Sequence, residues 1–279
     1  MSTNSAPKSF RERHHGLIWS LLWPVRAWFS GFPVNRGKGL LFRHVILPAL
    51  PPEPASFAYR LPHGETVDLR YREDLGTLVL FHGGYEDREI AELCKYVLDG
   101  GIVFNVGANI GLSALEFARN AGPSGKVFAF EPHPDTAARL RTNLDRNGVT
   151  NVEIVQSAVG AELGTITFNE SADATLSSAT LVPRNLVRSF DVPLTTVDKA
   201  WTDAGKPAVS AFKIDVEGGE LAVLQGATEL LARDHPAILL EAWGANQLDP
   251  IHALLTAAGY ERRQPAGFEP RNYLYLAKS

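Results

Sequence analysis

Hydrophobic and polar positions along the chain alternate between the period of a strand and the period of a helix. Short apolar runs are followed by stretches with apolar residues at helical spacing, and glycine closes several of these stretches. The expected strands are 102–106, 126–132, 152–160, 209–220 with its exit turn, 237–243 and 272–279. The expected helices are 86–101, 111–122, 135–148, 219–232 and 248–260. This alternation predicts an α/β domain with a mostly parallel sheet and helices on both faces.

Four segments lie outside this alternation. Residues 56–72 alternate around "HGE" and are expected to form a hairpin with Gly64 in its turn. Residues 164–170 are expected to be an extra strand, and residues 192–201 a strand that leads into a short helix. Residues 171–190 are rich in Ser, Thr and Ala without clear periodicity. We expect them to form a long loop, of the kind that often covers a functional site.

The N-terminal segment 16–32 is rich in Leu, Trp and Phe but is interrupted by Pro24 and Arg26. Its uninterrupted apolar length is well below the roughly 20 residues that a membrane-spanning helix needs. Two interpretations stay open: a helix that packs its aromatic face on the domain or on a second subunit, or a helix at a membrane surface. In the second interpretation, the residues at headgroup level are Trp19, Trp23 and Trp28.

A proline-rich hinge, "LPPEP" at 50–54, follows this apolar segment. Each proline fixes φ and resists a helix, so the hinge marks a boundary between units. We expect an apolar N-terminal extension over residues 1–54 and a single domain over residues 55–279.

Composition and charge exclude several classes of protein. Apolar residues make up 45% of the chain and charged residues 21%, which is ordinary for a soluble globular protein. The net charge of −4 argues against a nucleic-acid binder that relies on a broad basic surface. Cys94 is the one cysteine, so an intramolecular disulfide is excluded, and a structural zinc site is not expected. We expect a cytoplasmic protein, peripheral to the inner face of the membrane if residues 16–32 bind lipid.

The stretch "FNVGANIG", residues 104–111, joins a predicted strand to a predicted helix through a tight turn. Gly107 permits a positive φ or a close backbone approach to a ligand, and Asn109 tolerates the left-handed region. Gly111 lets the helix begin close to the strand. Ligands of doubly wound sheets bind beyond the carboxyl ends of the strands, so this turn is the expected cofactor loop.

The second predicted strand of this alternation ends in "FEP", with Glu131 twenty residues after Gly111. A carboxylate at this place accepts hydrogen bonds from ribose hydroxyls. The glycine turn and Glu131 together predict an adenosine-containing cofactor. This pair of features does not by itself separate NAD from S-adenosylmethionine.

Five motifs in order separate the two cofactors. They are "FNVGANIGLSALEFAR", "GKVFAFEPHPDTAARLRTNLDRNG", "VEIVQSAVG", "VPLTTVDK" and "FKIDVEGGELAVLQGATELL" with "PAILLEAW". With these motifs, the chain resembles the FkbM family of S-adenosylmethionine-dependent methyltransferases over roughly residues 85–245. The resemblance implies a Rossmann-like class I methyltransferase fold with a seven-stranded sheet whose last strand is antiparallel, and residues 272–279 fit that strand. It also implies methyl transfer to a hydroxyl oxygen of a small molecule, a sugar or a glycan.

The resemblance also implies roles for individual residues. The cofactor loop that faces the methionine end matches Gly107, Ala108, Asn109 and Gly111. The ribose-binding acid matches Glu131, followed by Pro132, and the border of the adenine matches Ser157 and Ala158. Asp215 matches the acid near the sulfonium, and Glu86 in "GYEDREI" matches an acidic position before the first core strand. Both are expected to be cofactor-binding residues. The family usually has Asp where this chain has Asn105, and we expect cofactor binding that persists but is weaker.

Transfer to a hydroxyl requires a general base or a metal ion that lowers the pKa of the hydroxyl. Asp215 and Glu217 follow one predicted strand, and Glu241 ends the next, so the three carboxylates are expected to converge. Lys213 lies on the same face of its strand as Asp215. It is a further candidate catalytic residue, or else a neutralising partner for Asp215 or Glu241. Asp215 is the preferred catalytic residue, then Glu217 and Glu241, and Asp215 with Glu241 would suit a divalent cation such as Mg²⁺.

Two nearby residues are expected to have ordinary structural roles. Glu220 is interpreted as a first-turn helix acid that the helix dipole favours. His133 is interpreted as a surface histidine in a turn.

Two other classes of function remain as alternatives. An NAD-dependent oxidoreductase would require G-x-G-x-x-G and usually a Tyr-x-x-x-Lys pair, and the chain has neither. A non-catalytic or membrane-docked module with a degenerate nucleotide site is favoured slightly by Asn105 and by the aromatic N-terminus. The presence of Glu131 and Asp215 opposes that interpretation.

Overall fold

The computed structural model describes residues 55–71, 73–82, 84–171, 177–178 and 186–278. The predicted membrane-surface or packing helix at 16–32 and the hinge at 50–54 lie outside these residues, so both stay predictions. The described residues belong to two compact units, one with residues 55–57 and 69–85 and the other with residues 58–68 and 86–278. Within the described residues, no helix is both long and apolar enough to cross a bilayer.

The predicted hairpin is confirmed. Strands β1 (Ser56–Arg60) and β2 (Thr66–Arg70) pair as a two-stranded sheet. The turn closes through the N–H of Leu61, which donates to the carbonyl of Glu65 at 2.8 Å, and Gly64 adopts φ 110°. The helix α5 (Asp74–His82) follows and was not predicted.

The main sheet among the described residues has seven strands in the order β12-β13-β11-β10-β3-β4-β5. They are β3 (Ile102–Val106), β4 (Lys126–Phe130), β5 (Val152–Val155), β10 (Val209–Ile214), β11 (Ala237–Glu241), β12 (Tyr260–Arg263) and β13 (Asn272–Ala277). From β5 to β11 all neighbours are parallel, whereas β13 runs antiparallel to both β11 and β12. The predicted seven-stranded Rossmann-like sheet with an antiparallel last strand is therefore confirmed. The short strand β12 was missed, because its first residue, Tyr260, falls at the end of the predicted helix 248–260.

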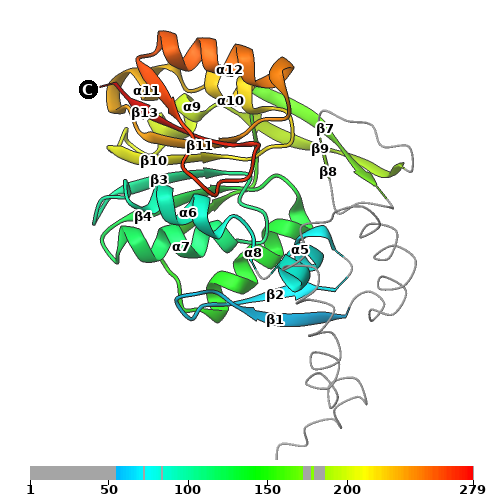
Figure 1. The fold of residues 1–279 in the computed structure, drawn as a ribbon. Helices are drawn as coiled ribbons and strands as arrows, with labels where there is room; N and C mark the ends of the chain where they lie inside the picture. The colour runs from blue at the N-terminus through cyan, green and yellow to red at the C-terminus, as the bar shows by residue number, and fades with distance from the viewer. Residues whose placement is uncertain (1–54, 72, 83, 172–176, 179–185, 279) are drawn as a thin grey trace, which may run out of the picture. The chain divides into compact units, whose positions relative to one another are not determined.

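Helices cover both faces of this sheet, as predicted (Figure 1). On one face, α6 (Asp87–Cys94) and α7 (Leu112–Ala121) pack on Val103, Val127 and Ala211. The helices on the other face are α9 (Val197–Asp203), α10 (Glu220–Gln225), α11 (Thr228–Asp234) and α12 (Ala245–Ala257). They pack on Phe104 and Phe212, which have no exposed surface. Helix α8 (Pro134–Arg146) follows β4 and contacts β5.

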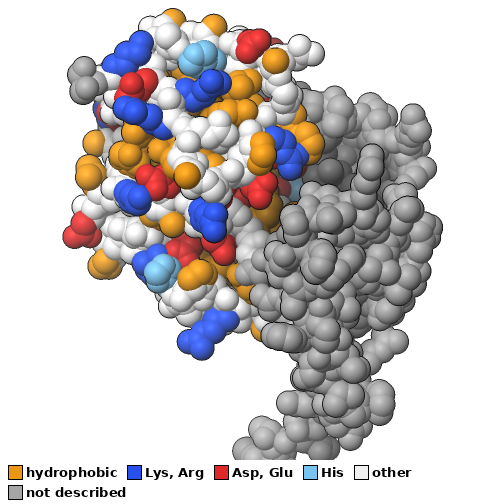
Figure 2. Space-filling view, viewed as in Figure 1, with side chains coloured by type: hydrophobic (Ala, Val, Ile, Leu, Met, Phe, Trp, Pro, Cys, Tyr) orange, Lys and Arg blue, Asp and Glu red, His pale blue; other side chains and the backbone are white. Residues whose placement is uncertain are grey.

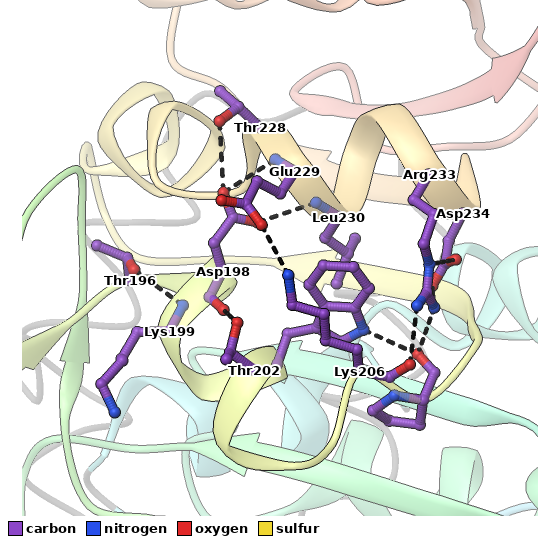
Figure 3. Close-up of polar contacts among 12 residues, drawn as sticks. Thr196, Asp198, Lys199, Thr202, Lys206, Thr228, Glu229, Leu230, Arg233 and Asp234 are labelled. Atoms are coloured by element: carbon purple, nitrogen blue, oxygen red, sulfur yellow. Dashed lines mark hydrogen bonds and ion pairs between the residues drawn. The ribbon is translucent and has the colours of Figure 1, made fainter.

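The predicted helix 219–232 is two helices in the structure, α10 and α11, and the break falls at Gly226. A Cβ at Gly226 would lie 2.1 Å from the carbonyl oxygen of Gly160, so only glycine allows this close packing. Helix α11 obtains its N-terminal cap from α9 instead of from its own chain neighbour. Figure 3 shows Asp198 accepting hydrogen bonds from the N–H groups of Glu229 and Leu230, both at 2.9 Å.

A second sheet, not predicted as such, has the strand order β6-β9-β7-β8. Its strands are β6 (Ala158–Val159), β7 (Gly164–Ser171), β8 (Ser177–Ser178) and β9 (Leu186–Thr195). The predicted extra strand at 164–170 and the strand before a short helix at 192–201 are confirmed. The predicted loop 171–190 is wrong in three places. Ser171 ends β7, Ser177–Ser178 form β8, and residues 186–190 belong to β9 and pair with β7.

Charged side chains of both signs are interspersed on the face of the molecule in Figure 2, among the residues that are coloured. This mixed surface is ordinary for a globular protein.

Candidate functional site

The predicted cofactor loop leaves β3 and is held against its two neighbouring strands. The N–H groups of Gly107 and Ala108 both donate to the carbonyl of Phe130, at 3.1 and 2.9 Å, where β4 ends. Gly107 has φ 83°, and a Cβ there would lie 1.8 Å from the carbonyl oxygen of Asp215. Glycine is therefore required at position 107 for both its φ and its close contact with the exit of β10.

The rest of the loop also depends on left-handed backbone. Asn109 has φ 50°, and its side-chain Oδ1 accepts from the N–H of Ile110 at 2.8 Å. Gly111 has φ 102° and immediately precedes α7, and a Cβ there would lie 2.5 Å from Leu140 Cδ1. The two glycines and the asparagine thus produce the tight strand-to-helix turn that the sequence predicts.

Glu131 ties this loop to the exit of β4. Its Oε2 accepts from the N–H of Asn109 at 3.0 Å, and its Oε1 accepts from the N–H of His133 at 2.9 Å. The residue is only 7% exposed. Burial raises the pKa of Glu131 to about 7, against the opposing effect of the two hydrogen bonds. A carboxylate has about four acceptor positions, so Glu131 retains the capacity to accept from a ribose diol. The acceptor positions of Glu131 therefore fit the ribose hydroxyls of an adenosine cofactor.

Asn105 lies inside the α/β core and not on the surface of the loop. The residue has no exposed surface, and its Nδ2 donates to the Oγ of Ser113 in α7 at 3.0 Å. The weaker cofactor binding expected from Asn105 stays a prediction, and any such effect would pass through α7 and the loop.

The residues predicted to border the adenine lie where the main sheet meets the second sheet. The Oγ of Ser157 donates to the carbonyl of Pro193 or Ala158, each at 2.9 Å. Ala158 begins β6 and is buried, and Pro132 is half-buried between Glu131 and His133. Their contact with a cofactor stays a prediction.

His133 is a correction to the sequence analysis, because it is buried and not on the surface. It is the N-cap of α8, where its Nδ1 accepts from the N–H groups of Asp135 and Thr136 at 3.2 and 3.4 Å. Burial lowers the pKa of His133. The ring of Phe190 in β9 meets it edge-on, with centroids 5.1 Å apart. The sequence could not reveal this burial, because it depends on the second sheet.

The three predicted catalytic carboxylates do converge. Asp215 and Glu217 follow β10, Glu241 ends β11, and one oxygen of each lies within 4.8 Å of the others. Such a set of oxygen donors could hold a hard divalent cation, and the predicted pair Asp215 and Glu241 is extended by Glu217. The structure shows the donor set and its spacing, and the presence of an ion stays a prediction.

Lys213 lies beneath this carboxylate cluster in an ion-pair network. Its Nζ is 2.8 Å from Asp215 Oδ2 and 3.1 Å from Glu86 Oε2. Glu86 also accepts from Asn272 Nδ2 at 3.1 Å. Burial alone would lower the pKa of Lys213, but the carboxylates of Asp215 and Glu86 outweigh it, and the pKa is raised. The structure thus joins Glu86 to Lys213 and Asp215, and the predicted contact of Glu86 with the cofactor stays a prediction.

Glu241 has an unusual environment for a carboxylate. Burial, together with the negative charges of Asp215 and Glu217, raises its pKa to about 7. Arg271 lies on its other side, with Nε 3.5 Å from Glu241 Oε1. Arg271 was not predicted, because it lies 30 residues after Glu241 in the chain, directly before β13, and has no motif around it.

Glu220 has the structural role that the sequence predicts. It is the first residue of α10, and its Oε1 accepts from the N–H groups of Val216 and Gly218 at 3.2 and 3.0 Å. It stabilises the turn that carries Asp215 and Glu217 into the site.

Comparisons with known proteins agree with this arrangement. The family model described as the methyltransferase FkbM domain matches residues 105–262. That range contains the glycine loop, Glu131 and all three carboxylates of the cluster.

Several curated proteins are similar to this chain. Methyltransferase sdnD of Sordaria araneosa is 28% identical over 190 residues, which cover 57% of this chain and 73% of that protein. Hexuronic acid methyltransferase AglP of Haloferax volcanii is 30% identical over 164 residues, which cover 59% of each. The 31-O-demethyl-FK506 methyltransferase FkbM of Streptomyces tacrolimicus is 29% identical over 207 residues, which cover 61% of this chain and 75% of that protein.

A solved structure of methyltransferase FkbM from Methylobacillus flagellatus KT superposes with a TM-score of 0.45 at 17% identity, covering 73% of this chain and 55% of that one. This structural similarity is low, and the fold is established by the strand order described above. The family model, in contrast, covers more than half of the chain. The chain belongs to the FkbM family of methyltransferases.

Proposed function

We propose that this protein transfers a methyl group from S-adenosylmethionine to a hydroxyl oxygen of a small molecule or a sugar. The observation that carries the proposal is the convergence of the Glu131-tied loop and the carboxylate cluster at the carboxyl ends of adjacent strands. Two relatives named for hexuronic acid and for 31-O-demethyl-FK506 support an oxygen acceptor. Family membership leaves the NAD-dependent alternative without support, and the intact site argues against a non-catalytic module.

In this proposal, Glu131 accepts hydrogen bonds from the ribose hydroxyls of the cofactor. The backbone of Gly107, Ala108, Asn109 and Gly111 faces the methionine end. Pro132, Ser157 and Ala158 border the adenine. The cofactor supplies an electrophilic methyl group on a sulfonium. The contribution of the protein is to hold that group in line with the acceptor oxygen, which is largely catalysis by proximity.

The acceptor hydroxyl must also lose its proton. The carboxylate of Asp215 is held in place by the Nζ of Lys213 at 2.8 Å, so it suits orienting the hydroxyl. Glu241, with a pKa of about 7, is well matched to accept the proton near neutral pH. Glu217 completes the negative cluster that would stabilise positive charge near the methyl group.

A divalent cation held by Asp215, Glu217 and Glu241 is the other route to an activated hydroxyl. Treatment with EDTA separates the two routes. Loss of methyl transfer that Mg²⁺ restores would identify the metal route, and activity that persists in EDTA would identify the general base.

The proposal is tested with methyl-labelled S-adenosylmethionine and a panel of hydroxyl acceptors that includes free sugars, glycosides and macrolactones. We expect label in at least one acceptor with the wild-type protein. The Asp215→Ala and Glu241→Gln variants should each lose at least about 100-fold in rate, since general bases contribute on that order. Circular dichroism checks that both variants fold. Full activity in Asp215→Ala would remove Asp215 from the mechanism.

A further inference from the structure

An exposed tryptophan stands beside the carboxylate cluster. Trp243 comes two residues after Glu241, just beyond the end of β11, and it is 52% exposed. Single exposed apolar residues are common on protein surfaces and need no explanation by themselves. In the described residues, the other exposed large apolar side chains are Leu78, Leu98 and Leu163. Trp243 differs from them because its side chain is aromatic and because it follows the end of β11, which carries Glu241.

Arg271 joins this tryptophan to the catalytic cluster. Its guanidinium carbon lies 3.7 Å from the centroid of the Trp243 ring, and its Nε lies 3.5 Å from Glu241 Oε1. A guanidinium in van der Waals contact with an indole is attracted by the ring electrons. One side chain therefore contacts both the exposed ring and the carboxylate with the raised pKa.

The backbone around Trp243 is also fixed. The N–H of Ala242 donates to the carbonyl of Arg271 at 2.9 Å, and the N–H of Trp243 donates to Gln247 Oε1 at 2.5 Å. These bonds tie the end of β11 to the start of β13 and to α12. Hydrogen bonds to two other elements thus hold the backbone that carries the exposed ring, as a preformed binding surface requires.

We propose that Trp243 and Arg271 form a platform on which the ring of a sugar acceptor stacks, with one of its hydroxyls directed at Glu241. The C–H face of a pyranose is apolar and covers an indole ring, while its hydroxyls donate to carboxylates. This inference rests on the proposed methyl transfer and names the class of its acceptor.

The charges of the site favour a neutral sugar over an anionic one. The cluster has the three carboxylates Asp215, Glu217 and Glu241, and the cations beside it, Lys213 and Arg271, are already paired with carboxylates. An additional negative charge on the acceptor would be repelled at this distance. Neutral hydroxyls, in contrast, find acceptors on all three side chains.

The test measures binding directly, by saturation-transfer NMR with the methyl glycosides of glucose, galactose and mannose as probes. Mannitol, a polyol without a ring, is the control ligand. The variants are Trp243→Ala, Trp243→Phe and Leu98→Ala, the last at an exposed residue that precedes β3 and lies at the opposite end of the strands. Each titration is run with and without S-adenosylhomocysteine, so the result does not depend on cofactor binding.

We expect Trp243→Ala to weaken binding of at least one glycoside about tenfold, Trp243→Phe to retain most of it, and Leu98→Ala to leave it unchanged. Binding of mannitol should not respond to Trp243→Ala. Equal glycoside binding by the wild-type protein and Trp243→Ala would overturn the platform, as would the absence of glycoside binding by the wild-type protein. Failure of S-adenosylhomocysteine to bind would instead count against the proposed methyl transfer.

Discussion

The Nζ of Lys213 lies 2.8 Å from Asp215 Oδ2, and the lysine side chain is only 4% exposed. The carboxylate of Glu86 contacts the same ammonium group from the N-terminus of α6. Glu86 has φ 53°, a conformation that costs energy for a residue with a side chain and that directs its carboxylate to the lysine. One buried cation thus joins the proposed catalytic carboxylate of Asp215, which follows β10, to the N-terminus of α6.

Replacing Lys213 by Met should destabilise the protein by about 3–5 kcal/mol, because the largely buried carboxylates of Glu86 and Asp215 then lose their cation. Guanidinium denaturation at neutral pH measures this loss. The matched control is Lys199→Met, which breaks an ion pair with Asp203 on a side chain that is 48% exposed. That control should cost less than about 1 kcal/mol. Similar losses in the two variants would show that the buried network is not a stabilising element.

The rate of methyl transfer should rise as pH increases through about 7, the pKa of Glu241, because only the ionised carboxylate accepts a proton. The measurement is kcat/KM as a function of pH, with Glu241→Gln as the comparison. We expect this limb of the profile to disappear in the variant. If the limb persisted unchanged, another group would be the base.

The stability of the protein without ligand should fall as pH rises towards about 7. Glu131 and Glu241 both have a folded-state pKa raised to about 7 from a usual value of 4.5. The folded state therefore binds more protons than the unfolded state between these values, and its stability decreases as the protons leave. Denaturation at about pH 5 and about pH 8 measures the slope. Both Glu131→Gln and Glu241→Gln should flatten it, and an unchanged slope would contradict the burial of these charges.

Gly107→Ala should disrupt the cofactor loop, whereas Gly148→Ala should have only a small effect. Both glycines have a positive φ, 83° and 65°, which costs alanine about 1 kcal/mol. A Cβ at Gly107 would also lie 1.8 Å from the carbonyl of Asp215, while nothing lies within 4 Å of one at Gly148. We expect loss of S-adenosylmethionine binding in Gly107→Ala alone, measured by calorimetry. Normal binding by this variant would mean that the loop can move away from β10.

Much of the main sheet and of the site could be predicted, because both depend on local patterns. The strand and helix periods identify the parallel strands, and carboxyl ends of adjacent parallel strands meet at one edge. That rule is enough to bring Asp215 and Glu241 together from the amino-acid sequence alone. The glycine turn and Glu131 are likewise a short-range signal.

The parts that were missed depend on long-range contacts. Strand β9 pairs with β7 across a segment without periodicity, so its first half resembled a loop. Glu86, Lys213 and Asn272 meet from three distant parts of the chain, and no local feature of "GYEDREI" indicates a buried ion pair. Gly226 breaks a helix because of its contact with Gly160, which the helical period of residues 219–232 cannot reveal.

Calorimetric titration of the wild-type protein and of Glu131→Ala with S-adenosylmethionine and with NAD determines whether Glu131 holds the ribose of S-adenosylmethionine. We predict that the wild-type protein binds S-adenosylmethionine and not NAD, and that Glu131→Ala weakens binding at least about tenfold, the effect of losing hydrogen bonds to a charged group. This role of Glu131 would be contradicted if the wild-type protein bound NAD in preference to S-adenosylmethionine. It would also be contradicted if the wild-type protein and Glu131→Ala had equal affinity for S-adenosylmethionine.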